Sequence, residues 1–211
     1  MENLLNKINF KKDKYLIKKN ILSKEICDFM YHYFFLRVKV ADTLFKTTYI
    51  SNSDTDWGTW ADPQVPNTYS IYGDIATETL LMKLRPVMEK ATNLKLVETY
   101  SYARVYKKGD VLKKHTDRKS CDISTTLNLG GDAWPIFLKD TNNKTIKVNL
   151  NPGDMLIYSG CELEHWREEF TGNKCIQTFL HFNKAKKKDS NQYDNRLHLG
   201  LPCWFKEKFN K

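Results

Sequence analysis

The sequence lacks any apolar run long enough to cross a bilayer. It also lacks an apolar block near its start, because residues 1–20 (MENLLNKINFKKDKYLIKKN) carry scattered charges where a secretory signal has an uninterrupted apolar core. Both absences argue against a membrane-spanning or secreted protein. We therefore expect a cytoplasmic location and no membrane partner.

Paired cysteines are missing as well. The five cysteines are odd in number, widely spaced and never arranged as C-x-x-C, which argues against a disulfide framework and against a zinc ribbon. We interpret all of them as free thiols. They are Cys27, Cys121, Cys161, Cys175 and Cys203.

No dedicated nucleic-acid-binding motif accompanies the positive charge of the chain. The formal net charge is +9, and the run KAKKKD at residues 184–189 could serve an anionic partner. The lysines are spread through the chain, however, so a solvated surface is the simpler explanation. A nucleic-acid partner stays open without support from a motif, and the sequence does not indicate an oligomeric state.

Size and composition favour a single domain over residues 1–211. A chain of 211 residues with 41% hydrophobic and 13% aromatic content can bury a full core, and it contains no internal repeat or low-complexity segment. We expect residues 1–95 to form supporting helices and a loop, and residues 96–183 to form a jelly-roll core. The tail, residues 184–211, is expected to be a short helix or an extended segment that packs back onto the sheet.

Two helices are predicted in the first part of the chain. Residues 23–39 begin at a plausible cap, Ser23, and residues 74–93 show a similar apolar period, in which Pro86 should kink or split the helix. The segment between them, residues 51–69, has no period and predicts a long loop. This loop is either a lid or binding loop, or a surface segment anchored by Trp57 and Trp60. The stripe expected to be buried on the first helix is Ile26, Phe29, Met30, Tyr33 and Leu36.

From residue 96 onward the pattern changes to short strands. Residues 96–106 (LVETYSYARVY) alternate strictly, which places Tyr100, Tyr102, Arg104 and Tyr106 on one face. Further strands separated by turn signals are expected within 121–130, 134–140, 145–150, 154–160, 164–170 and 175–182. We predict an α+β protein with a mainly β core, a double-stranded β-helix (jelly roll) with N-terminal supporting helices.

A histidine and an aspartate stand two residues apart in LKKHTDRKSC, residues 112–121. Side chains two apart on a strand point to the same side, so His115 and Asp117 could both bind one divalent metal. A third ligand would come from a later strand, where His165 and His181 are candidates. We choose His165, because it follows a tight turn, an apolar strand and a small loop. Two histidines and one carboxylate leave one side of a metal open, as in non-haem Fe(II) oxygenases.

An H-x-D pair alone is more often a hydrogen-bonded pair on a barrel surface, so the neighbouring segments decide the interpretation. Residues 100–118 (YSYARVYKKGDVLKKHTDR), 151–166 (NPGDMLIYSGCELEHW) and 172–182 (GNKCIQTFLHF) resemble the catalytic core of the Fe(II)- and 2-oxoglutarate-dependent dioxygenases. The resemblance is closest to the prolyl 4-hydroxylase-like branch. It covers roughly residues 96–183 and includes the H-x-D pair and the distal histidine.

The resemblance implies a set of cosubstrate-binding residues. Lys174, nine residues after His165, matches the basic residue that anchors the distal carboxylate of 2-oxoglutarate in this family, and Arg167 is its competitor. Thr178 could add a hydroxyl to that carboxylate. Tyr106 matches a tyrosine that lines the cosubstrate pocket, and Tyr102 shares its alternation.

The implied activity is that of an oxidoreductase, a dioxygenase that contains Fe(II) at His115, Asp117 and His165 and uses 2-oxoglutarate and dioxygen (O2). It would hydroxylate a prolyl or other peptidyl residue and release succinate and CO2, so a peptide or protein substrate is expected before a small molecule. One alternative keeps this chemistry but acts on a small molecule or a nucleic acid base. The other is a non-catalytic jelly-roll binding module.

Overall fold

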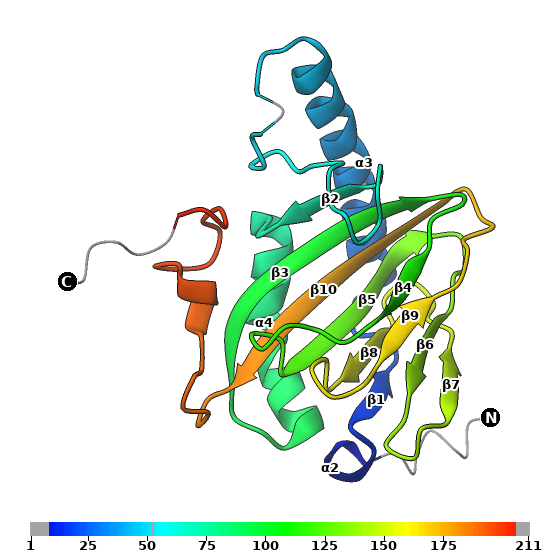
Figure 1. Ribbon diagram of the computed structural model, residues 1–211, viewed down its shortest axis with the longest axis vertical. Coiled ribbons are helices and arrows are strands. Elements are labelled where there is room, and N and C mark those ends of the chain that lie inside the picture. Colours follow the sequence, from blue (N-terminus) through cyan, green and yellow to red (C-terminus); the bar gives the residue numbers. More distant parts are fainter. Residues whose placement is uncertain (1–8, 52, 206–211) are drawn as a thin grey trace.

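The computed structural model describes residues 9–51 and 53–205, so the ends of the expected domain, residues 1–8 and 206–211, lie outside the described residues. Two antiparallel sheets pack face to face, and two helices cover the outer face of the larger sheet (Figure 1). The helices are α2 (Phe10–Asp13), α3 (Lys24–Lys46) and α4 (Ile75–Thr92), and the 3-10 helix is η1 (Gln192–Asn195).

The larger sheet has the strand order β1-β8-β5-β10-β3-β2, and the smaller has β4-β9-β6-β7. This arrangement confirms the expected mainly β core. The strands are β1 (Tyr15–Lys18), β2 (Tyr69–Tyr72), β3 (Leu96–Lys107), β4 (Leu112–His115), β5 (Ile123–Gly131), β6 (Ile136–Lys139), β7 (Thr145–Val148), β8 (Met155–Tyr158), β9 (His165–Arg167) and β10 (Lys174–Lys184).

The first 95 residues are not only helices and a loop, as the sequence suggested. Strand β1 pairs with β8, and β2 pairs with β3, so both edges of the larger sheet come from this part of the chain. Each of these strands has four residues. This is too few to show the two-residue alternation of a strand beside segments with a helical period. Their pairing partners lie far away in sequence, and it is this pairing that makes them strands.

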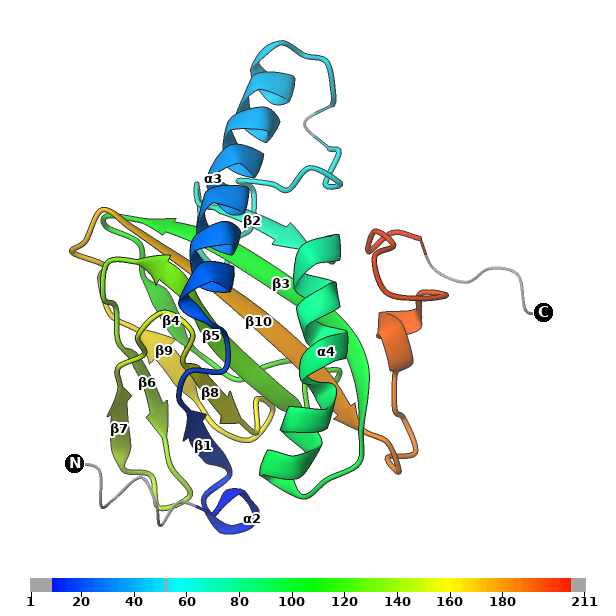
Figure 2. The same cartoon turned by 180° about the vertical axis from the view of Figure 1, so that it is seen from behind.

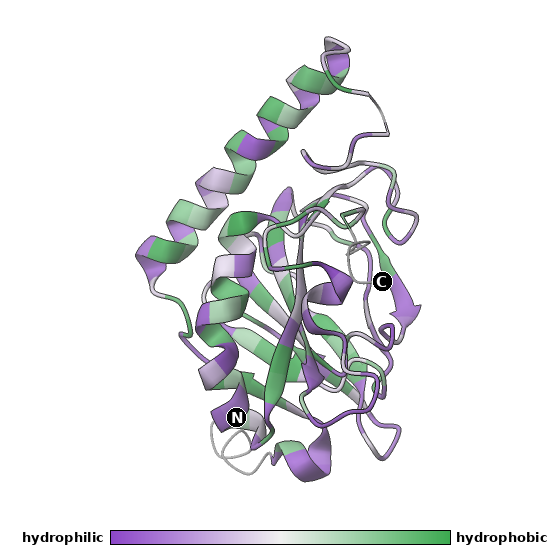
Figure 3. Ribbon diagram, turned by 90° about the vertical axis from the view of Figure 1, so that its left-hand side faces the viewer, coloured by the Kyte–Doolittle hydropathy of each residue, from purple (hydrophilic) through white to green (hydrophobic). Residues whose placement is uncertain are grey.

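Helix α3 begins after Ser23, whose hydroxyl accepts a hydrogen bond from the amide of Ile26 at 3.4 Å, as expected for its cap. The expected stripe was right for Met30, which is buried, and for Tyr33, which packs against the core, but wrong for its other three residues. Phe29 and Leu36 are exposed to 66% and 63%, and Ile26 is also exposed. Hydrophobic residues recur along the helix (Figure 3), so more than one helical face satisfies the apolar period. The side that packs on the sheet carries Cys27, Met30, Phe34 and Ala41.

Helix α4 runs as one helix through Pro86, so of the two expected outcomes, a kink or a split, the split does not occur. Pro86 cannot donate a backbone hydrogen bond to the turn before it. Buried side chains on both sides of this position, Leu81 and Met88, hold the two halves of the helix on the sheet. Figure 2 shows α3 and α4 side by side on this face.

The C-terminal segment packs back onto the body of the protein, as expected for its described part. Arg196 is buried, and its Nη2 lies 2.7 Å from Oε1 of the buried Glu78 in α4. Tyr72 at the end of β2 donates a hydrogen bond to Asp194 at 2.8 Å. These contacts attach the segment beside β2, β3 and α4.

Two phenylalanines of α3 provide a test of which helical face is buried. Phe34 is fully buried and Phe29 is exposed. We expect Phe34→Ala to lower the free energy of unfolding by about 3–5 kcal/mol, because it leaves a cavity in the core. Phe29→Ala should change it by less than about 0.5 kcal/mol. Urea denaturation of both variants measures this, and a larger effect of Phe29→Ala would restore the sequence-based stripe.

Candidate metal centre

Strands β4 and β9 bring two histidines together. They pair in antiparallel register with His115 opposite His165, and the two ring centroids lie 4.2 Å apart. Asp117 is not in the strand, since β4 ends at His115, but its backbone amide donates a hydrogen bond to the carbonyl of Gly160 at 2.8 Å. The expectation that one strand carries both residues is therefore only half right. The end of β4 and the segment after it, which is held by this hydrogen bond, still bring the side chains of His115 and Asp117 together.

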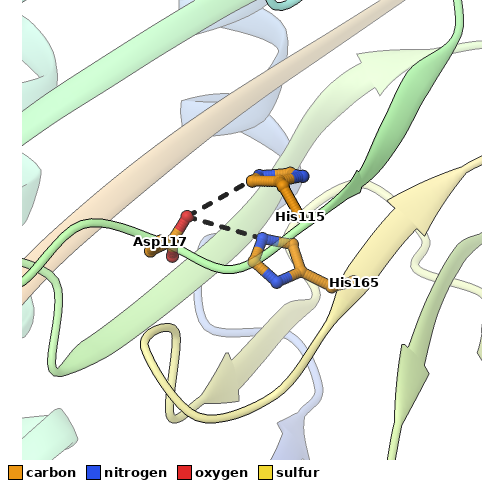
Figure 4. A group of neighbouring side chains, drawn as sticks. All are labelled: His115, Asp117 and His165. Atoms are coloured by element: carbon orange, nitrogen blue, oxygen red, sulfur yellow. Dashed lines mark ion pairs between the residues drawn. The ribbon is translucent and has the colours of Figure 1, made fainter.

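The three side chains point toward one another (Figure 4). Oδ1 of Asp117 lies 3.7 Å from Nε2 of His115 and 3.5 Å from Nε2 of His165. One ligand atom from each residue lies within 4.8 Å of the other two, which is a spacing that could hold a metal ion. Among the described residues this is the one group of three or more histidine, cysteine or acidic side chains with such a spacing.

Backbone carbonyls select the ring nitrogens that are free to bind a metal. Nδ1 of His115 lies 2.8 Å from the carbonyl oxygen of Lys113, and Nδ1 of His165 lies 2.9 Å from that of Leu163. A carbonyl can only accept, so both Nδ1 atoms carry the proton and both Nε2 atoms keep their lone pairs. These lone pairs are the ones beside Asp117. Burial lowers the pKa of His115, and the neighbouring His165 ring lowers it further, which favours the neutral ring that a metal requires.

A hydrogen bond from Ser124 orients the carboxylate of Asp117. Oδ2 of Asp117 accepts a hydrogen bond from the Ser124 hydroxyl at 2.6 Å, and that hydroxyl lies 3.0 Å from Nδ1 of His181. Burial by itself would raise the pKa of Asp117, but the neighbouring rings of His165 and His181 and the hydrogen bond from Ser124 outweigh it and hold this pKa well below its usual range. Burial also lowers the pKa of His181 to about 4. The ionised Asp117 and the neutral His115 fit a divalent cation.

Gly160 is a site residue that sequence reasoning missed. A Cβ at this position would lie 2.3 Å from both Oδ2 of Asp117 and Oγ of Ser124. Any side chain here would displace the carboxylate or its hydrogen-bond donor. The only local signal is a glycine in the small loop before His165, and many turns contain one.

A cavity of about 270 Å³ opens beside the three candidate ligands. The tyrosine face expected on β3 lines it, with Tyr100, Tyr102 and Arg104. The lining also includes Asp62 and Gln64, which come from the loop before β2 and which sequence reasoning missed. The other lining residues are Leu112, His115, Thr116, Asp117, Arg118, Ile136, Tyr158, His165, Phe179 and His181.

The loop of residues 51–69 therefore contributes to the cavity, in agreement with one of the two interpretations of its sequence. Its Trp60 packs edge-on against Phe45 and Tyr69, with ring centroids 5.7 and 5.1 Å away. This packing holds the loop on the fold, two residues before Asp62. Trp57 is more exposed and lies under the guanidinium of Arg37.

Of the five expected cosubstrate residues, Tyr102 lines the cavity, whereas Arg167, Tyr106, Lys174 and Thr178 do not. Lys174 and Thr178 also lie on the wrong side of their strand. Lys174 is exposed, and its ammonium lies 3.9 Å from the ring centroid of Phe35 in α3. Thr178 is buried, but its hydroxyl donates to the carbonyl of Tyr102. Strand alternation explains both corrections, because even-numbered residues of β10 face the helices while Phe179 and His181 line the cavity.

Arg167, by contrast, is completely buried. Its Nη2 donates to Oγ1 of Thr126 at 3.1 Å, and its Nη1 donates to the carbonyl of Trp134. Its Nε has no hydrogen-bond partner among the described residues, and no ion pair to Arg167 forms among them. Leu112, its cross-strand neighbour, lines the cavity. The expected Tyr106 is also buried nearby, with its hydroxyl 3.4 Å from Nη1 of Arg104.

No family model matches the chain, and no curated protein matches it in sequence. Solved structures do match its fold. The non-haem α-ketoglutarate-dependent carbocyclase SnoK from nogalamycin biosynthesis aligns with a TM-score of 0.64 at 11% identity, covering 96% of this chain and 92% of that one. A Pseudomonas putida prolyl-4-hydroxylase aligns with 0.59 at 13%, covering 86% and 97%.

A third match is HygX from Streptomyces hygroscopicus, solved with nickel and 2-oxoglutarate bound. It has a TM-score of 0.58 at 12% identity and covers 92% of this chain and 93% of that one. The chain therefore has the fold of 2-oxoglutarate-dependent oxygenases, and the expected fold class is confirmed. No helix in the described part of the chain has the length and apolarity of a membrane span.

Replacement of any one candidate ligand should weaken metal binding. We expect His115→Ala, Asp117→Ala and His165→Ala each to lower the affinity for Fe(II) by at least about 100-fold, more than is typical for loss of an outer hydrogen-bond partner. Anaerobic calorimetric titration of metal-free protein measures this. His32→Ala, at an exposed histidine of α3, should have no effect. A candidate whose replacement leaves the affinity unchanged is not a ligand.

Gly160→Ala should also weaken metal binding while leaving the protein folded. The added methyl group displaces the Asp117 carboxylate, and we expect a loss of about 10–100-fold in Fe(II) affinity, as for other disturbances around metal ligands. Gly109→Ala is the control for the general cost of replacing a glycine, because its added Cβ has nothing within 4 Å and its φ of +86° strains an alanine backbone. An equal effect of both replacements would show that the loss is a general cost of replacing glycine.

Proposed function

We propose that this protein is an Fe(II)- and 2-oxoglutarate-dependent oxygenase. The observation that carries the proposal is the convergence of Nε2 of His115, Nε2 of His165 and Oδ1 of Asp117 beside a cavity. Two imidazoles and one carboxylate with open positions are the donor set of non-haem Fe(II) oxygenases. The shared fold and the sequence resemblance support the same chemistry.

Fe(II) with bound 2-oxoglutarate would supply oxidative decarboxylation to succinate and CO2, coupled to the transfer of an oxygen atom from O2 into a C–H bond. The protein's own side chains hold and orient these groups. His115, Asp117 and His165 would hold the metal, with Ser124 fixing the free oxygen of the carboxylate. The aromatic lining of Tyr100, Tyr102 and Tyr158 would limit the access of water.

We further propose that Arg167, and not Lys174, anchors the distal carboxylate of 2-oxoglutarate. Arg167 lies two residues beyond His165 on the same side of β9, roughly 7 Å along the strand. Burial lowers the pKa of its guanidinium, because a buried charge without a counter-ion is costly. A carboxylate would supply that counter-ion and accept from the unpaired Nε. Tyr106 lies nearby and remains a candidate for the same pocket.

The substrate predicted from the sequence, a prolyl or other peptidyl residue, remains our first candidate, and one matching structure is a prolyl-4-hydroxylase. A small molecule is the second candidate. The cavity of about 270 Å³ favours it, since 2-oxoglutarate would occupy part of that volume. Other matching structures include a carbocyclase and HygX with hygromycin B bound, so this fold accommodates varied substrates.

Anaerobic absorption titration tests the cofactor assignment. Metal-free protein should develop a weak visible charge-transfer band only when both Fe(II) and 2-oxoglutarate are present, and His165→Ala should abolish it. Absence of the band in the unmodified protein would contradict the proposed function and favour the non-catalytic binding module. Formation of succinate under air provides an independent measurement.

The same titration distinguishes the two basic residues. Arg167→Gln should raise the concentration of 2-oxoglutarate needed for half of the band by about 10–100-fold, because a charged, buried hydrogen-bonding partner is lost. Lys174→Gln, the same replacement at an exposed position, should leave it unchanged. The opposite pattern would return the anchoring role to Lys174, even if Arg167→Gln proved too unstable to titrate.

A further inference from the structure

Arg104 is a second buried cation, and it lies in the wall of the cavity itself. Its side chain is only 2% exposed, and its guanidinium lies between the rings of Tyr102 and Tyr106, at 5.4 and 5.6 Å from their centroids. Nη1 points to the hydroxyl of Tyr106, while Nε has no hydrogen-bond partner among the described residues. Arg104 is therefore held rigidly, but its donors are not all used.

The carboxylate that pairs with Arg104 comes from a loop. Asp62 accepts from Nη2 of Arg104 and, at 2.5 Å, from the hydroxyl of Tyr102. Gln64, two residues later, accepts from the same Nη2 at 3.0 Å. Neither residue belongs to a helix or strand, and both line the cavity. An acidic group of the protein thus occupies the part of the cavity where a ligand would meet Arg104.

The balance of charge around the cavity limits which ligand could replace Asp62. Arg118 in the lining already pairs with Asp194 at 2.8 Å, and Asp117 belongs to the metal centre. Arg104 and Asp62 remain, and they neutralise each other. A ligand carboxylate that takes the place of Asp62 preserves this neutrality and can also use the free Nε. An amine there would leave two cations facing each other in a buried space, which is unfavourable.

We propose that Arg104 is the specificity-determining residue of the cavity and binds a carboxylate of the substrate, which displaces the side chain of Asp62. This inference rests on the proposed function for the reaction, and it adds the class of substrate, a carboxylic acid. Because Arg104 and the candidate metal ligands line one cavity, a substrate held by its carboxylate would place a neighbouring C–H bond beside the metal. In the absence of substrate, the Asp62 carboxylate takes the place of the substrate carboxylate at Arg104.

A binding experiment with matched acid and amide ligands tests the proposal. Protein loaded with Zn(II), which is redox-inert, and saturated with 2-oxoglutarate is titrated calorimetrically with N-acetyl amino acids and with their primary amides. We expect at least one acid to bind at least about tenfold more tightly than its own amide, the difference typical of a charged hydrogen-bonding pair. Blocked tripeptides with an internal glutamate, tested against glutamine, distinguish a peptide carboxylate from a free acid.

Variants at both partners make the test specific. Arg104→Gln should abolish the preference for acids, and Arg104→Lys, which keeps the charge, should retain part of it. Asp62→Asn should make acids bind at least about threefold more tightly, because an internal competitor is removed. A merely structural ion pair would give the opposite result, since loss of Asp62 would then weaken binding or leave it unchanged.

Three results would overturn the proposal. The first is that every acid binds with the same affinity as its amide. The second is that the Asp62→Asn variant binds acids more weakly than the unmodified protein does. The third is that amines bind and that their binding depends on Asp62. Failure of the proposed function gives a different pattern, because Zn(II) and 2-oxoglutarate would then not bind at all. The preference of Arg104 for carboxylates can still be measured in that case with metal-free protein.

Discussion

The antiparallel pairing of β4 with β9 is the constraint on which the candidate centre depends. It places His115 opposite His165 although fifty residues separate them in the chain, and it aims both rings into the space between the two sheets. Asp117 then needs only a short turn, tethered to Gly160, to complete the group. Each ligand is held by backbone hydrogen bonds, so the geometry exists before a metal arrives. Preorganisation of this kind reduces the cost of binding.

Two buried arginines have hydrogen-bond donors that the fold does not use. Arg104 and Arg167 are both buried, and each has a nitrogen without a hydrogen-bond partner among the described residues. A buried donor without a partner destabilises a fold, and Arg167 also lacks a counter-ion, so both arginines are candidates for a binding site. A ligand carboxylate at each arginine would accept a hydrogen bond from its unpaired nitrogen. Arg167 would take the cosubstrate, and Arg104, whose partner is a loop carboxylate, would take the substrate.

Alternate residues of a strand lie on opposite faces of the sheet, and this decides which of them can reach the candidate site. Spacing along the sequence made Lys174 a reasonable match, since it stands nine residues after His165. In β10, however, even-numbered residues face α3 and α4, whereas Phe179 and His181 face the cavity. A shift of one residue therefore removes a side chain from the site completely. In our proposal, Arg167 meets the same chemical need from a different strand.

The sequence by itself determined the strand core and the H-x-D pair, because alternation and short spacings are local properties that survive in any fold of this type. It predicted His165 as the third ligand from its place beside a later strand. Only the tertiary structure decided the rest. It showed that α3 buries the face of Phe34, although several apolar faces compete on that helix. It also brought Asp62 to Arg104, forty-two positions away, and set Gly160 against Asp117. These outcomes depend on packing between segments distant in sequence, and no local pattern encodes which side chains will meet there.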